Sequence, residues 1–128
     1  MAIYWLWGLI EDMEARIMTS AIRLERLRCQ EPQDSLTDEV MIQVNGRQVW
    51  PPSGSFSLNR ETEVGLNVQE VYEGQVDVTL FDHEDLGTDD NMGGVLIPEG
   101  NTNGSRTTDI TSSGSHYILT YRTKSLEF

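Results

Sequence analysis

The sequence predicts an all-β protein, an eight-stranded antiparallel β-sandwich that follows a short N-terminal amphipathic helix. Three observations lead to this prediction. From about residue 20 onward, apolar and polar residues alternate in short runs, the pattern of strands with one buried face. Gly, Asn, Pro and Ser gather between these runs, where tight turns use them. The chain of 128 residues is long enough for one domain with a single core.

The helix is expected in residues 1–19, where apolar residues recur at steps of three and four. These residues are Ile3, Leu6, Ile10, Met13 and Ile17. Trp5 and Trp7 make the segment too apolar to stay solvated. It packs against the sandwich, or it serves as a docking peptide or homo-oligomer contact through Trp5, Trp7 and Ile10, or it inserts at a membrane interface. The acidic polar face argues against membrane insertion.

The strands are expected near residues 21–29, 38–49, 55–58, 63–71, 75–82, 93–98, 106–110 and 115–123. They define a sandwich domain over residues 20–124, with residues 125–128 as a tail. Turn dipeptides such as Asn45-Gly46 and Asn103-Gly104 separate the runs. Residues 20–28 also suit a continuing helix, because their leucines have helical spacing, but the downstream pattern favours a strand.

One acidic segment directly follows the strand expected at 75–82. It carries five carboxylates in nine residues, from Asp82 to Asp90. Two like charges about 4 Å apart repel by roughly 1 to 4 kcal/mol, so the loop stays splayed in water or holds a cation. Calcium takes about six to eight oxygen ligands and tolerates irregular loops, which makes it the expected ion.

A second acidic segment, residues 31–39, connects the first two expected strands. If these two strands lie in one half of the sandwich and the 75–82 strand lies in the other, both acidic loops emerge at the same end. The side chains that would then converge on one or two calcium ions are Asp34, Asp38, Asp82, Glu84 and Asp90. Three further acids remain as spares, namely Glu31, Asp85 and Asp89.

The spacing Asp82-x-Glu84-x5-Asp90-Asn-Met-Gly resembles the third calcium loop of C2 domains. The segment 37–44 resembles the end of the first calcium loop of that family. The resemblance covers about residues 20–123, and it implies a C2-like eight-stranded sandwich with calcium held between loops at one edge.

The chain departs from the C2 pattern at two positions. Pro32 stands where the family usually places the first aspartate of its first calcium loop, so Asp34 or Glu31 would have to substitute. Glu84 replaces the usual aspartate in the third loop, and its longer side chain can still chelate a cation.

Composition excludes several classes of function. The net charge of -12 argues against nucleic-acid binding, and against tight docking on an anionic membrane unless bound cations first reverse the local field.

Cys29 is the single cysteine, so an internal disulfide is impossible, and we expect it to be buried on a strand. His83 and His116 are expected to be structural or exposed. There is no recognisable signal peptide, no apolar run that could span a membrane and no catalytic motif. The protein is therefore not expected to be an enzyme, and its localisation stays open.

The expected function is a non-catalytic calcium-binding module, in which calcium orders one edge of the sandwich for stability or for binding a partner. Leu36 and Leu86 lie at the two loop tips and are expected to pack inward. The alternative is that bound calcium pushes them into a membrane or a protein groove. A calcium-independent interaction or self-assembly module that uses the aromatic N-terminal segment is a further alternative.

Overall fold

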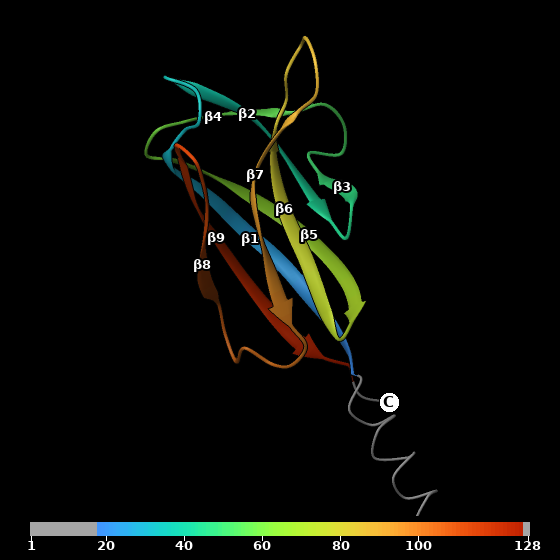
Figure 1. Ribbon diagram of the computed structural model, residues 1–128. Coiled ribbons are helices and arrows are strands. Elements are labelled where there is room, and N and C mark those ends of the chain that lie inside the picture. The colour runs from blue at the N-terminus through green and yellow to red at the C-terminus, as the bar shows by residue number, and fades with distance from the viewer. Residues whose placement is uncertain (1–17, 127–128) are drawn as a thin grey trace, which may run out of the picture.

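The computed structural model describes residues 18–126, which form nine strands in two antiparallel sheets (Figure 1). The strands are β1 (Thr19–Glu31), β2 (Thr37–Val44), β3 (Arg47–Trp50), β4 (Phe56–Asn59), β5 (Thr62–Glu73), β6 (Gln75–Asp82), β7 (Asp90–Pro98), β8 (Arg106–Ser112) and β9 (Ser115–Ser125). The all-β sandwich is confirmed, and the segment 20–28, which suited helix or strand, is part of a strand.

The first sheet has the strand order β5-β1-β9-β8, and the second has the order β3-β2-β6-β7. Strand β4 pairs with the first half of β2, and β3 pairs with the second half, so both lie along the same edge of β2. The expected arrangement, with the first two strands in one half and β6 in the other, was wrong. β1 lies in the first sheet, whereas β2 and β6 are neighbours in the second.

The expected count of eight strands was one too low, because the segment predicted at 38–49 forms two strands. Asn45 and Gly46 adopt positive φ angles of 49° and 81°, the conformation of a tight hairpin turn, and they separate β2 from β3. The Asn-Gly turn signal therefore outweighs the continuous apolar alternation around it.

One apolar core fills the space between the sheets, because alternate residues of each central strand point inward. On β1 these are Ile22, Leu24, Leu27 and Cys29, all fully buried. A β-bulge at Glu25 adds one residue to β1, so Leu24 and Leu27 both point inward although they are three positions apart. The β6 residues Val76, Val78 and Leu80 cover the opposite side of the core. The prediction that Cys29 is buried on a strand is confirmed.

The predicted N-terminal helix lies almost entirely in residues 1–17, which fall outside the described part of the chain, as do the contacts predicted for Trp5, Trp7 and Ile10. Thr19, the last residue of that prediction, belongs to β1, and β9 extends to Ser125. The strands thus reach one residue beyond each predicted limit of the sandwich. No helix within residues 18–126 is long and apolar enough to cross a membrane.

Candidate metal site between two acidic loops

Two loops meet at one end of the sandwich because of how their strands pair. Residues 32–36 link β1 to β2 across the two sheets, and residues 83–89 link β6 to β7. Val40 on β2 lies opposite Asp82 on β6, so the start of one strand lies beside the end of the other. The His83 N–H continues this pairing by donating to the Glu39 carbonyl (2.8 Å). Both loops lie at the upper end of the molecule in Figure 1.

Asp82 is the last residue of β6, and its side chain is fully buried between the loops. Its Oδ1 accepts a hydrogen bond from the Glu39 N–H (2.8 Å). Its Oδ2 is buried and has no hydrogen-bond partner within residues 18–126. The pKa of Asp82 is raised to about 7, mainly by burial and also by the neighbouring Asp34 and Asp38 carboxylates, against the lowering effect of the Glu39 N–H. A buried anionic oxygen without a partner is costly unless a proton or a cation neutralises it.

Asp34 and Glu84 bring two further carboxylates to the same place. One oxygen each of Asp34, Asp82 and Glu84 lies within 4.8 Å of the others. Asp34 comes from the first loop and Glu84 from the second, so residues far apart in sequence share one cluster. Partial burial and the nearby Asp90 raise the pKa of Glu84, the larger cause being burial. These three residues are the acidic cluster to which the following paragraphs refer.

Asp38 is close to the acidic cluster but has a different role, because both of its oxygens accept hydrogen bonds. Its Oδ2 accepts from the Gln33 N–H (2.7 Å), and its Oδ1 accepts from the Asp34 N–H (2.9 Å). The Tyr117 hydroxyl also donates to Oδ2. Burial, followed by the neighbouring Asp38, raises the pKa of Tyr117 well above its usual range. Asp38 therefore holds the backbone of the first loop in the shape that presents Asp34.

Asp90 begins β7 directly opposite Asp82, and its side chain is exposed. It acts on the acidic cluster through Glu84, whose pKa it raises. Of the five predicted ligands, the structure thus brings three together, places Asp90 beside Glu84, and gives Asp38 hydrogen bonds that shape the first loop.

The remaining acids of the two loops have contacts elsewhere. Glu31 forms an ion pair with Arg60 (2.8 Å). Asp89 accepts from the Glu84 N–H (3.0 Å) and contacts His83 Nδ1 (3.0 Å), which braces the second loop internally. The His83 and His116 rings are partly exposed, and neither is among the residues that could jointly hold a metal.

The two loop-tip leucines do not pack inward, which corrects the sequence-based expectation. Leu36 is 78% exposed and Leu86 is 92% exposed. Both leucines project into solvent, each from a loop that also carries a carboxylate of the acidic cluster.

Sequence reasoning missed Tyr117 and the Glu39 N–H, which hold Asp38 and Asp82 from two different strands. No local signal marks either of them. Tyr117 lies 79 positions from Asp38, and a backbone N–H has no signature in the sequence.

No protein-family model and no curated protein sequence matches the chain. Its fold, however, is similar to solved C2-domain structures. The C2A domain of plant Extended Synaptotagmin 1 superimposes with a TM-score of 0.51 at 10% identity, over 87% of this chain and 97% of that domain. Human GIVD cytosolic phospholipase A2 gives a TM-score of 0.54 at 13% identity, over 88% of this chain and 16% of that enzyme.

The same human enzyme in complex with an inhibitor and terbium chloride gives a TM-score of 0.53 at 11% identity. This chain corresponds to about a sixth of that enzyme's length, covering 17% of it. At such identities the likeness concerns the fold. The protein has a C2-like β-sandwich fold, as the resemblance of its loop spacing implied.

Proposed function

We propose that this protein is a non-catalytic calcium-binding module whose ion is held between the two acidic loops. The observation that carries the proposal is Asp82 Oδ2, a buried carboxylate oxygen without a partner among residues 18–126. One oxygen of the Asp82 carboxyl group lies within 4.8 Å of an oxygen of Asp34 and of an oxygen of Glu84. A fully buried carboxylate that faces two more acids is costly while it is charged and unpaired, and a bound cation would remove that cost without requiring the acid to be protonated.

The donor set fits a hard cation. Asp34, Asp82 and Glu84 supply carboxylate oxygens, and Asp90 lies beside Glu84 as a further donor. Calcium suits this set because it accepts six or more oxygens in irregular geometry, at roughly 2.3 to 2.6 Å. Magnesium demands a tighter octahedral shell and keeps more of its water. Asp38 contributes by fixing the loop backbone.

The effect of calcium would be to order one edge of the sandwich. Without a cation, like charges push the two loops apart. A bound divalent ion turns this repulsion into attraction to a common centre and joins the first loop to the second. The edge so formed carries the acidic cluster and the two exposed leucines, and this is the surface that would meet a partner.

Titration calorimetry of calcium into chelator-treated protein tests the proposal. Wild-type protein should bind with a dissociation constant of about 10⁻⁴ to 10⁻³ M, as open extracellular-type sites do. Asp34→Asn removes one charge from the acidic cluster and should weaken binding at least about tenfold. Asp109→Asn is the matched control, because Asp109 lies on β8 and pairs with His116 (2.8 Å). Equal affinities for wild type and Asp34→Asn would reject the assigned site.

A second candidate, calcium-dependent docking on a membrane, is favoured by the exposure of Leu36 and Leu86 at the loop tips. Calcium would neutralise the acids around them, and the leucines would enter the interface. Sedimentation with phosphatidylserine vesicles in calcium tests it: the double variant Leu36→Ala/Leu86→Ala should lose binding. Leu96→Ala is the control, because Leu96 is 58% exposed on β7, away from the loops. Calcium binding without vesicle binding would leave the first proposal and remove this one.

A further inference from the structure

The outer face of the first sheet carries a cluster of positive charge that the calcium proposal does not use. Five of the nine Lys and Arg residues of the chain occupy outward positions on two adjacent strands, β1 and β9: Arg23, Arg26, Arg28, Arg122 and Lys124. They alternate with buried residues such as Ile22 and Leu119. In a protein with a net charge of -12, this concentration creates one local region that attracts anions.

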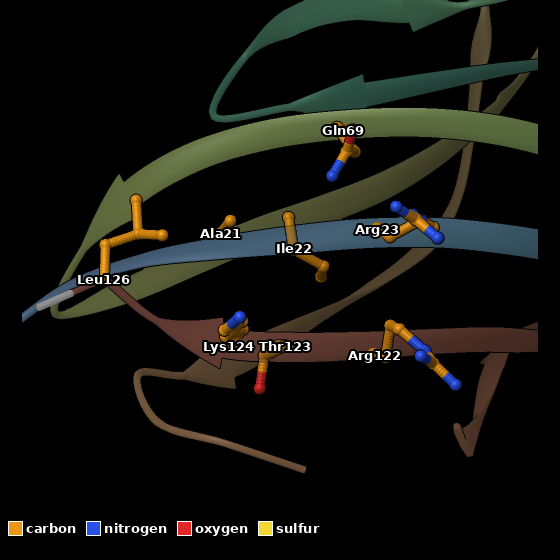
Figure 2. A pocket seen from close by; sticks show the side chains of 8 residues that line it. All are labelled: Ala21, Ile22, Arg23, Gln69, Arg122, Thr123, Lys124 and Leu126. Carbon is orange, nitrogen blue, oxygen red and sulfur yellow. The ribbon is translucent and has the colours of Figure 1, made fainter. Parts of the chain in front are cut away.

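Two of these cations face each other across the sheet. Arg23 and Arg122 are direct cross-strand partners, and Figure 2 shows them side by side on neighbouring strands. Like charges at such a pair destabilise a sheet. Arg122 has one carboxylate neighbour, Glu25, at 3.4 Å. Within residues 18–126, Arg23 and Lys124 form no ion pair. Of these three cations, only Arg122 has an ion-pair partner among the described residues, so positive charge is left that a bound anion would neutralise.

A hollow of about 240 Å³ lies on this part of the face (Figure 2). The residues that line it are Ala21, Ile22, Arg23, Gln69, Arg122, Thr123, Lys124 and Leu126. Gln69 is the neighbour of Arg23 on β5, so its carboxamide adds a neutral donor beside the guanidinium groups. Ala21 and Leu126 make the other end of the hollow apolar. The hollow therefore combines cationic donors with a small apolar surface, which suits a compact amphiphilic anion.

We propose that this hollow is a binding site for a phosphate monoester, held through its phosphate by Arg23, Arg122 and Lys124. Guanidinium groups donate in a fork that matches phosphate oxygens, and an ammonium group adds a point charge. A phosphomonoester carries a charge of about -1.5 to -2 near pH 7, which balances the local excess. Its organic part lies over Ala21 and Leu126. The volume fits a small headgroup rather than a polymer.

This site is independent of the proposed calcium site. The hollow involves the first residues of β1, whereas the first acidic loop follows the last residue of β1, Glu31, and the second acidic loop follows β6. Binding is therefore expected in the presence of a chelator, and it should weaken as salt rises, because exposed charges are screened.

The test is calorimetric titration of the full chain with glycerol 3-phosphate in a chelator-containing buffer, with parallel sedimentation on phosphatidylcholine vesicles that contain phosphatidic acid. Both probes present a phosphomonoester, one free and one on a lipid. Arg23→Gln and Arg122→Gln should each weaken binding by about tenfold or more, since each removes a charge-assisted hydrogen bond. Arg47→Gln is the matched control. Arg47 lies on β3, an edge strand of the second sheet, and its charge is already paired with Glu70 (2.8 Å).

Binding of the free ester that is lost in both variants and kept in the control supports a soluble ligand. Binding of the vesicles but not of the free ester, again lost in both variants and kept in the control, supports a lipid-borne phosphate. The proposal is overturned if neither probe binds, or if Arg23→Gln and Arg122→Gln bind as the wild type does. Thermal melts of the variants check the fold, and exposed Arg→Gln changes at these positions should leave it intact.

Discussion

At the scale of single residues, Asp82 lies in an unfavourable environment for a charged side chain. Folding buries its carboxylate, supplies one backbone N–H to Oδ1 and leaves Oδ2 without a hydrogen bond among residues 18–126. Its neighbours Asp34 and Asp38 are acids as well. A group in this position stabilises the fold when it is neutralised and destabilises it when it is charged and alone.

Replacing Asp82 by Asn is therefore expected to have opposite effects on stability and on calcium binding. Asn keeps the shape and the acceptor for the Glu39 N–H but removes the buried charge. The metal-free variant should melt a few degrees higher than the wild type at pH 8, at about 4 to 8 °C per kcal/mol for a small domain. Calcium should then no longer raise its melting temperature. A variant that still binds calcium with wild-type affinity would contradict the role given to Asp82.

The pH dependence of stability follows from the same residue. Its pKa is about 7 in the folded chain against 3.8 as the ordinary value, so the folded state binds more protons between these pH values. The contribution of Asp82 to the stability of the metal-free protein is therefore fully present below pH 3.8. This contribution is lost as the pH rises to about 7. Urea denaturation at a series of pH values should show this fall, and Asp82→Asn should flatten it. Saturating calcium should also flatten it, because metal binding requires the deprotonated carboxylate.

At the scale of elements, the first loop owes its shape to a contact between distant strands. Asp38 at the start of β2 accepts hydrogen bonds from two loop N–H groups and from Tyr117 on β9. A strand of the first sheet thereby supports the loop that carries Asp34, and Asp34 lies close to Asp82 at the end of β6 in the second sheet.

Tyr117→Phe is expected to destabilise the protein by about 1 to 3 kcal/mol, because it removes a buried hydrogen bond to a carboxylate. Calcium affinity should fall as well, since the loop that carries Asp34 loses one of its supports. Tyr121→Phe on the same strand is the control, since its hydroxyl forms no hydrogen bond within the described residues. Urea denaturation measures the stabilities, and equal values for both variants would contradict the role of Tyr117.

The structure gives a physical reason for the glycine at position 93, which ends the second acidic motif. Its φ is +100°, and a Cβ at this position would lie 2.5 Å from the Thr111 carbonyl oxygen. Gly93→Ala should therefore cost about 1 to 3 kcal/mol through overpacking, beyond the backbone strain of a positive φ. Gly46→Ala measures that strain alone, because Gly46 has φ +81° and a Cβ added there would meet no atom within 4 Å. Thermal melts should rank Gly93→Ala as clearly less stable than Gly46→Ala.

What the sequence could predict depended on the range of the interactions. The all-β class and the second acidic loop were predictable, because alternation and the Asp82 to Asp90 spacing are local patterns. The break between β2 and β3 also has a local signal, Asn45-Gly46, but the apolar-polar alternation that continues on both sides of it favoured one long strand. The function of Asp38 was not predictable, since it depends on Tyr117 and on the pairing of two sheets. The exposure of Leu36 and Leu86 was not predictable, because whether a loop-tip side chain packs inward depends on how the loops are arranged in the fold and not on a local pattern.

At the scale of the whole molecule, charge is unevenly divided. The net charge of -12 is concentrated partly in two loops at one end, whereas five cations occupy the outer face of the first sheet. The two proposals assign a cation to the first region and an anion to the second. Each ligand lowers a repulsion that the folded chain creates for itself.

The most direct test of the central claim is a thermal melt of chelator-treated protein with and without calcium. A ligand at a few times its dissociation constant stabilises by roughly 0.5 to 2 kcal/mol, so millimolar calcium should raise the melting temperature by several degrees. Magnesium at the same concentration should raise it less, and Asp82→Asn should not respond to calcium. A wild-type melting temperature that stays unchanged when calcium is raised a further order of magnitude would contradict the calcium site.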